Sequence, residues 1–237
     1  MAAVIRPARR LPIRVALVVL CLLQAAAGQA QNCRADKDSR ICGEGKDALR
    51  LFEGTASPSG KFAFAWRSAN GIPASGIPLD VENLLVRAAD GAILARLGGA
   101  YWATSQSRAN RYDSSATWSP DSRAVIELAN DRWDTVSLRY YALGSDDSAE
   151  PFDLYPLVEP AVKAKLPPRK RESYTFRVRE DQPIKLDARG HARFFAMLYI
   201  IKSDAPSLDY DVRVDLTRRD GKTAAKLVSI RRVSLPP

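Results

Sequence analysis

The sequence predicts an all-β fold, and three observations support this expectation. Residues 57–66 and 118–128 follow one plan, a tight turn, a cation and then an apolar strand, and they stand 62 residues apart. In the first of these strands apolar side chains recur at every second position, the period of a half-buried strand. Asp-Gly pairs at 90–91 and 220–221 are typical of hairpin turns. The echo at a fixed spacing indicates a fold built from repeated β units.

The first 30 residues have the three parts of a secretory signal peptide. Residues 1–14 carry four arginines and no acid, and residues 15–23 form an apolar run that is too short to span a bilayer. Gly28 and Ala30 then place small side chains at the −3 and −1 positions of a signal peptidase site. We therefore expect cleavage after Ala30 and exclude residues 1–30 from the fold.

Export and charge narrow the classes of function. The Arg9-Arg10 pair fits the twin-arginine route, but Pro12 stands where that signal has an apolar residue, so the general secretory (Sec) route is favoured. Loss of the four signal arginines lowers the formal net charge from +9 to +5, a modest surplus that does not favour nucleic acid as a partner. No later apolar run reaches membrane length, so we expect a periplasmic or secreted protein with no transmembrane segment after cleavage.

Residues 31–50 form an N-terminal segment that contains both cysteines of the mature chain, Cys33 and Cys42. In an oxidising compartment the two are expected to form a disulfide. A redox pair is the alternative, but its usual spacing is two residues and here eight residues intervene. The sequence therefore predicts a structural staple.

Residues 51–154 are expected to form two β units. In the first, residues 84–87 and 93–97 flank the turn at 89–91 and form a hairpin. In the second, the turn at 119–122 leads into a strand at 124–128. A second strand at 135–143, a polar turn at 144–148 and a short strand at 151–154 complete the unit. Residues 71–79 are expected to form a long loop inside the first unit.

Residues 173–237 are expected to form a third, divergent unit. A turn at 186–190 leads into a strand at 191–201, and residues 208–218 and 223–233 form a hairpin around Asp220-Gly221. Alignment of Gly60, Ser122 and Gly190 brings three large apolar residues to one position, namely Phe64, Ile126 and Phe194. If repeated units share one core layer, each unit must have a large apolar residue at this position.

A connector at residues 155–172 separates the second and third units. It holds four prolines and ends in the basic run 169–171. Apolar residues between 157 and 166 have helical spacing, which predicts a short helix after Pro160. The Pro-Pro pair and the basic run that follow predict a solvated linker.

The plan of turn, strand and hairpin resembles the WD-like β-propeller repeats of bacterial periplasmic proteins, whose units begin with a Ser-Pro-Asp-Gly-Lys turn. Residues 55–97 and 116–154 match this pattern, with Ser59 in place of the usual Asp and Ser122 in place of the usual Gly. Residues 184–233 match only in outline. The resemblance implies propeller-like antiparallel sheets and a role in binding, and it carries no catalytic residues.

The number of units leaves the closure of the fold open. Propellers use four to eight blades, and this chain has about three units and one short helix. The units form an incomplete array, or pack as a β-sandwich, or close a ring only as an oligomer.

Few residues suggest a catalytic or metal-binding role. His191, the only histidine, aligns with Lys61 and Arg123 just after a turn, so it is expected to be a surface residue rather than a catalytic base. Acids at 209, 211 and 215 alternate with apolar residues, which predicts that they lie on the solvent-exposed face of an amphipathic strand. A calcium site is the alternative interpretation of these acids. No motif indicates a metal or another cofactor.

Two loop clusters combine aromatic residues with arginine and predict a binding surface. Such residues on loops are the usual anchors of interfaces, although they also cap sheet edges. The candidate binding residues are Tyr101, Trp102, Arg108, Asn110, Tyr112, Arg132, Trp133 and Asp134. We expect the two clusters to share one face of the molecule.

The leading hypothesis is an exported, non-enzymatic module that binds protein or envelope polymer in a bacterial envelope. A hydrolase that cleaves envelope glycan or peptide with paired carboxylates is the second hypothesis. An accessory or structural partner of a secretion or envelope complex, which would offer an uncovered sheet edge, is the third.

Overall fold

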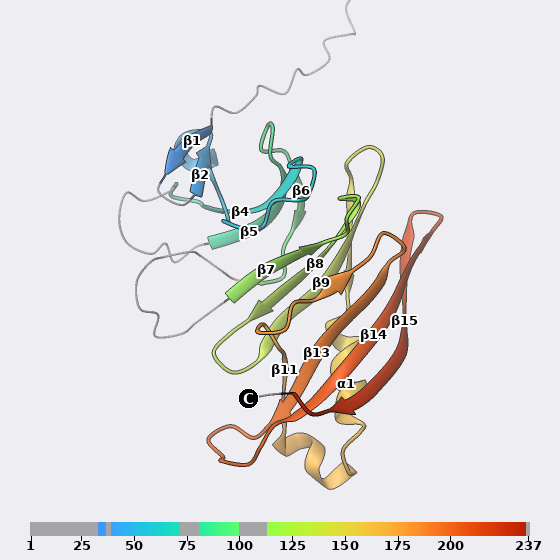
Figure 1. Cartoon of the computed structure of the whole chain (residues 1–237). Coiled ribbons are helices and arrows are strands. Elements are labelled where there is room, and N and C mark those ends of the chain that lie inside the picture. The colour runs from blue at the N-terminus through green and yellow to red at the C-terminus, as the bar shows by residue number, and fades with distance from the viewer. Residues whose placement is uncertain (1–32, 37–38, 72–80, 100–112, 236–237) are drawn as a thin grey trace, which may run out of the picture.

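The computed structural model describes residues 33–36, 39–71, 81–99 and 113–235. These residues form an all-β fold of antiparallel sheets, as the sequence predicts, with one α-helix (Figure 1). No helix within these ranges is long and apolar enough to cross a membrane. The expected signal peptide at residues 1–30 lies outside them, and so does nearly all of the expected loop at 71–79.

Three sheets follow one another along the chain, and the strands of each lie side by side in chain order, apart from β12, which pairs with β13 beside β11. The first sheet contains β1 (Cys33–Asp36), β2 (Ser39–Cys42), β3 (Leu49–Leu51), β4 (Phe62–Ser68), β5 (Val81–Arg87) and β6 (Ile93–Arg96). The second contains β7 (Asp113–Trp118), β8 (Ala124–Asn130), β9 (Thr135–Leu143) and β10 (Ala149–Asp153). The third contains β11 (Thr175–Val178), β12 (Lys185–Leu186), β13 (His191–Tyr199), β14 (Leu208–Arg219) and β15 (Lys222–Val233).

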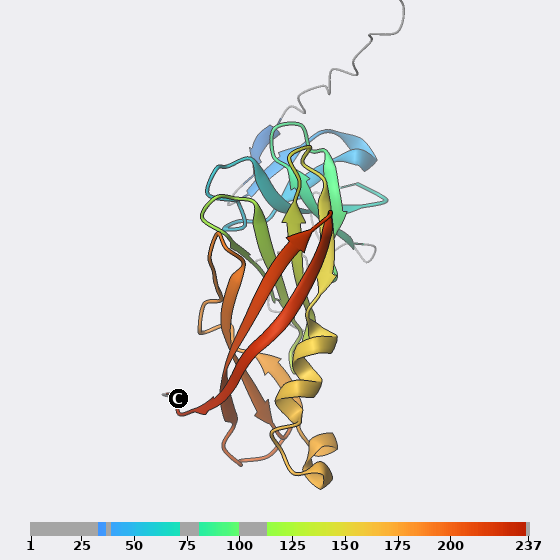
Figure 2. The ribbon, with the colours of Figure 1, turned by 90° about the vertical axis from the view of Figure 1, so that its right-hand side faces the viewer.

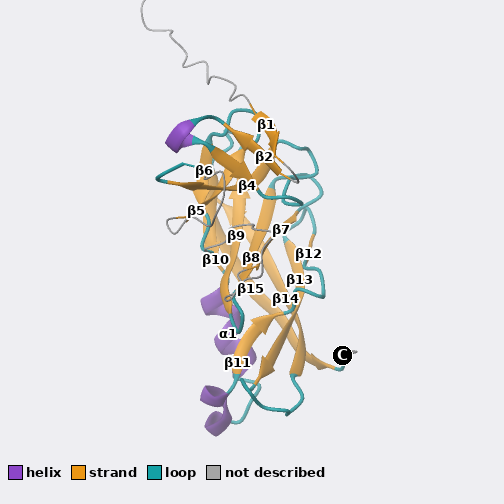
Figure 3. Cartoon of the chain, turned by 90° about the vertical axis from the view of Figure 1, so that its left-hand side faces the viewer, coloured by secondary structure: helices purple, strands orange, loops and turns teal. Residues whose placement is uncertain are grey.

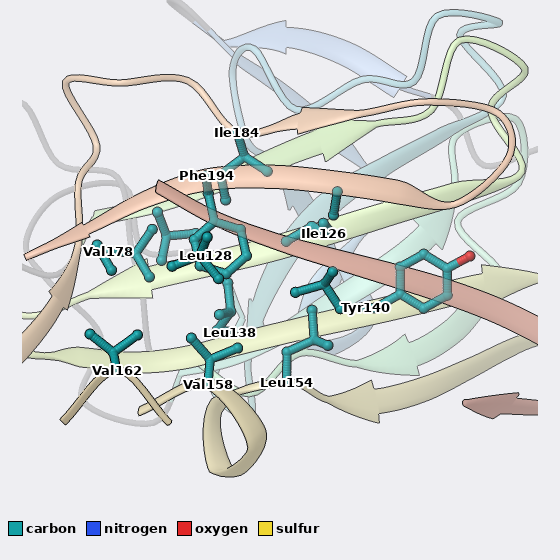
Figure 4. Packing of buried hydrophobic residues seen from close by; sticks show 14 of the residues in the cluster. Ile126, Leu128, Leu138, Tyr140, Leu154, Val158, Val162, Val178, Ile184 and Phe194 are labelled. Carbon is teal, nitrogen blue, oxygen red and sulfur yellow. The ribbon is translucent and has the colours of Figure 1, made fainter. Parts of the chain in front are cut away.

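The second sheet lies between the other two (Figure 1). The even-numbered side chains of β8 and β9, among them Ile126 and Leu138, pack against the third sheet and the α-helix (Figure 4). The odd-numbered side chains Val125, Tyr141 and Leu143 of the same two strands pack against the first sheet. The described residues therefore form an open stack of three layers, and they show no closed propeller.

The three turns that the sequence aligns have related local geometry. Gly60, Ser122 and Gly190 all have positive φ, at 68°, 59° and 86°. Each donates its backbone N–H to the carbonyl three residues earlier, at 2.8, 2.9 and 3.1 Å. The aligned side chains of Phe64, Ile126 and Phe194 are fully buried. Repeated β units would have the same turn hydrogen bond and the same buried position in each unit, as these three turns do. Whether the units are true repeats stays a prediction.

The two Asp-Gly hairpins differ. Asp220 and Gly221 both have positive φ and form a two-residue turn between Arg219 and Lys222, as the sequence predicts. At the other pair only Gly91 has positive φ, in a longer loop in which the carboxylate of Asp90 accepts a hydrogen bond from the N–H of Ala92. A type I′ turn needs positive φ at both central residues and a type II′ turn needs it at the first, so the turn at Asp90-Gly91 is of neither type.

The predicted disulfide between Cys33 and Cys42 is present. The two cysteines face each other across the β1–β2 pair, and β3 joins this hairpin to β4. The N-terminal segment therefore forms the first strands of the first sheet.

The connector folds more than the sequence indicates. Helix α1 (Tyr155–Lys163) begins five residues before Pro160, after which the sequence predicts its start, and contains Pro160 in its interior. The burial of Leu154, Val158 and Val162 against the second and third sheets explains this, because it outweighs the helix hydrogen bond that proline cannot make (Figure 4). The 3₁₀ helices are η1 (Gly45–Asp47) and η2 (Pro168–Ser173), the latter in the expected linker.

The first and second sheets are tied by a charge cluster at one end. Asp147, in the β9–β10 turn, is 6% exposed and accepts hydrogen bonds from Lys61 Nζ at 2.7 Å and from Arg87 Nη1 at 3.0 Å. The hydrogen bond from Lys61 lowers the pKa of the Asp147 carboxyl, and the one from Arg87 adds to this. Both cations belong to the first sheet, so one carboxylate joins two layers.

Alanine at Gly190 should destabilise the fold more than alanine at Gly60. A left-handed backbone costs an alanine roughly 1–2 kcal/mol at either position. At Gly190 a Cβ would also lie 2.2 Å from the carbonyl oxygen of Leu216, whereas at Gly60 nothing lies within 4 Å. Urea unfolding of Gly190→Ala and Gly60→Ala measures the difference. Equal losses of unfolding free energy would contradict the close approach.

Asp147→Asn should lower the free energy of unfolding by about 1–3 kcal/mol at pH 7. Because the folded pKa lies below the unfolded one, the carboxylate stabilises the fold above about pH 4, and this contribution is lost as the pH falls through the folded pKa. The difference in urea midpoint between Asp147→Asn and wild type should therefore be largest at pH 7 and smaller at pH 3. Asp204→Asn, at an exposed loop position, is the control.

Candidate functional site

The predicted binding residues divide into two groups. Tyr101, Trp102, Arg108, Asn110 and Tyr112 lie outside the described residues, so whether the two clusters share a face stays a prediction. The second group belongs to the turn between β8 and β9, which the structure describes. Its members are Arg132, Trp133 and Asp134.

The β8–β9 turn is held by its own hydrogen bonds. The carboxylate of Asp131 accepts hydrogen bonds from the backbone N–H groups of Trp133 and Asp134, both at 2.6 Å. The N–H of Asp131 donates to the carbonyl of Asp134 at 2.9 Å. Aspartate at the start of a turn is favoured for this reason, since its side chain supplies the acceptor that the turn backbone lacks.

The flanks of the turn are fixed to β11 of the third sheet. The hydroxyl of Thr135 donates to Asn130 Oδ1 and accepts from the N–H of Val178, both at 2.7 Å. Asn130 Nδ2 donates to the carbonyl of Val178 at 3.0 Å. The guanidinium of Arg177 donates to the carbonyl of Asp131 at 2.7 Å. The two sheets therefore meet at a fully hydrogen-bonded junction, with the turn beside it.

An aromatic surface stands on this junction. The Trp133 side chain lies under the guanidinium of Arg132, 4.7 Å from the ring centroid, and the residue is 37% exposed. The hydroxyl of Tyr199, at the end of β13, donates to the carbonyl of Trp133. We call Arg132, Trp133 and Tyr199 the Trp133 surface. Exposed tryptophan stacked with arginine is typical of binding surfaces.

Asp134 lies on the side of the turn that faces α1. Burial raises the pKa of its carboxyl, and the negative charges of Asp131 and Glu159 raise it further against the opposing effect of Lys163. Burial also raises the pKa of the neighbouring Tyr155, with Glu159 adding to the effect. A carboxyl with a raised pKa holds a proton more readily and can donate a hydrogen bond.

The acids on β14 lie on the face opposite the core, as the alternation predicts, but two of them are covered. Asp209 and Asp211 are 7% and 5% exposed, because arginine side chains lie over them. Arg179 contacts Asp209 and Arg193 contacts Asp211, each at 2.9 Å. In the described part of the chain no group of three or more His, Cys, Asp or Glu residues is arranged to hold a metal ion.

His191 lies at an exposed position at the start of β13. Its Nδ1 is 2.8 Å from the carboxylate of Asp187, whose backbone and side-chain hydrogen bonds with His191 lower the pKa of that carboxyl. Lys61 and Arg123, which align with it, are exposed as well.

Sequence reasoning missed a buried carboxylate. Glu127 is fully buried on the face of β8 that meets the first sheet. It accepts hydrogen bonds from Gly99 N–H at 2.7 Å, Gly98 N–H at 3.0 Å and Tyr141 OH at 2.7 Å. The sequence does contain a signal for this carboxylate. Glu127 is an acid in the middle of an apolar strand, and the neighbouring glycines Gly98 and Gly99 offer backbone N–H groups without bulky side chains. The contact fixes the backbone just before residues 100–112, which carry the first group of predicted binding residues.

Thr135→Val should weaken the junction beneath the Trp133 surface by about 1–3 kcal/mol, because the isosteric change leaves the Val178 N–H and Asn130 Oδ1 without partners. Amide hydrogen exchange should speed up at Val178 and Trp133. Thr217→Val, at an exposed position of β14, serves as the control. Unchanged exchange in Thr135→Val would mean that the turn is held without the junction.

No family model, curated protein or solved structure matches this chain. The resemblance to propeller repeats therefore stays a prediction from the two turn motifs.

Proposed function

We propose that the mature chain is an exported, non-enzymatic binding module of the bacterial envelope, which binds protein or envelope polymer through the Trp133 surface. One observation carries the proposal. Trp133 is partly exposed and stacked with Arg132 on a turn whose two flanks, Asn130 and Thr135, are hydrogen-bonded to Val178 of another sheet. A side chain already held in its binding position loses little conformational entropy when a partner arrives.

The compartment follows from other observations. The N-terminal sequence predicts export, and the Cys33–Cys42 disulfide fits an oxidising compartment. We therefore place the protein in the periplasm or outside the cell. Partners in those compartments include other proteins and the polymers of the envelope.

A carboxylate hydrolase is the second candidate, and the raised pKa of Asp134 beside Asp131 and Glu159 favours it. The geometry favours binding instead. Oδ1 of Asp131 accepts hydrogen bonds from two backbone N–H groups of its own turn, so this carboxylate has a structural role in holding the turn. A hydrolase of this kind needs a pair of carboxylates that flank the bond to be cleaved.

Trp133→Ala should abolish capture of the partner while the melting temperature stays within about 2 °C of wild type, because replacing a partly exposed side chain leaves no buried cavity. C-terminally tagged mature protein is crosslinked in its native envelope, and the captured partner or polymer is identified. Val136→Ala is the matched control, since Val136 is an exposed apolar residue of the same hairpin. Equal capture by both variants would exclude the Trp133 surface, and a large loss of stability in Trp133→Ala would assign the ring to the core.

A further inference from the structure

The end of α1 and the segment after it form a rigid wall rather than a linker. The guanidinium of Arg171 donates hydrogen bonds to the carbonyls of Leu166 and Ala164, at 3.2 and 3.4 Å. These carbonyls follow the end of α1, where helical acceptors lack partners. Arg171 thereby fixes the loop that carries Lys165 and Lys170.

A pocket of about 400 Å³ lies between this wall and the strands β14 and β15. Figure 2 shows α1 and the helical turn after it alongside the β14–β15 hairpin. Figure 3 shows these helical segments from the opposite side. The lining residues come from both elements and are Lys165, Leu166, Pro167, Lys170, Tyr174, Leu208, Tyr210, Ile230 and Arg232. The volume is at the lower end of the range for small-molecule sites.

The charge of the pocket has one sign. Lys165, Lys170 and Arg232 line it, and no carboxylate does. Within the described ranges none of the three forms an ion pair, whereas the arginines on the outer face of the third sheet contact Asp209 and Asp211. Cations that no acid of the described residues pairs with give the pocket a positive potential, which attracts an anion.

Tyr210 adds a hydrogen-bonding group to the wall of the pocket. The residue is 3% exposed and lines the pocket, and none of the described residues forms a hydrogen bond with its hydroxyl. A tyrosine hydroxyl that no protein group engages can donate a hydrogen bond to a ligand. Burial raises the pKa of Tyr210, and the charge of Arg232, its cross-strand neighbour, opposes the rise. The hydroxyl therefore stays protonated at neutral pH and can donate.

The remaining walls are apolar. Leu166 is buried, and Leu208 and Ile230 are half-buried against the core that the second sheet, the third sheet and α1 enclose. A ligand that satisfied only the cations would leave this apolar surface in contact with water. The lining therefore suits a molecule that has both an anionic and an apolar part.

We propose that this pocket binds a small amphiphile with one anionic head group on an alkyl chain. Arg232 and the two lysines contact the head group, and Tyr210 donates to it. The chain packs on Leu166, Leu208 and Ile230. The pocket shares no residue with the Trp133 surface, so this inference stands apart from the proposed function.

Titration calorimetry of the mature protein with sodium decanoate tests the proposal. Acetate supplies the head group without the chain, and decyltrimethylammonium supplies the chain with the opposite charge. Arg232→Gln and Arg231→Gln form a matched pair, because the two arginines are adjacent and exposed, and only Arg232 lines the pocket. Tyr210→Phe removes the free hydroxyl and nothing else.

One decanoate should bind per chain. Arg232→Gln should weaken it about tenfold, the expected effect of one charge-assisted contact, and Arg231→Gln by less than about twofold. Tyr210→Phe should weaken binding without lowering the melting temperature, since none of the described residues forms a hydrogen bond with the lost hydroxyl. Equal affinity for acetate or for decyltrimethylammonium would overturn the proposal. The absence of decanoate binding, or equal losses in the two arginine variants, would overturn it as well.

Discussion

Every side chain of β8 is withdrawn from water, so each face of the second sheet must be covered by another layer. An antiparallel sheet often keeps one face in solvent, and its strands then alternate between apolar and polar residues. β8 lacks this alternation, since Val125 faces the first sheet and Ile126 faces the third. The stack of three layers follows from this constraint, and neither outer sheet can be removed without exposing apolar surface.

Burial on both faces places polar groups where they must have partners. Glu127 and Asn130 are fully buried on β8, and each bonds to a different neighbouring segment. Glu127 accepts hydrogen bonds from the glycines that leave the first sheet, and Asn130 bonds to β11 of the third. A buried polar group without a hydrogen-bond partner destabilises the fold more than a hydrogen-bonded one stabilises it. The layers must therefore sit where Glu127 and Asn130 keep their partners.

The local features were predictable, and the contacts between layers were not. The Asp220-Gly221 hairpin, the β9 strand and the disulfide depend on neighbours in sequence or on compartment, which the sequence carries directly. Helix α1 begins before Pro160 because of packing against two sheets, which no local pattern contains. The Trp133 turn was found from its composition, but its support by Thr135 and Val178 depends on a contact between sheets.

The basic side chains around the connector fall into two groups. Some have partners within the protein and so have a structural role, and others line the pocket without an acidic partner among the described residues. Arg171 caps carbonyls at the end of α1, as Arg179 and Arg193 cover acids on β14, so each is satisfied within the protein. Lys170 and Arg232 line a pocket to which the described residues contribute no acid. Since like charges around one cavity repel, the fold alone gives no reason to gather them. The anionic ligand that we propose supplies that reason, because each cation attracts its charge.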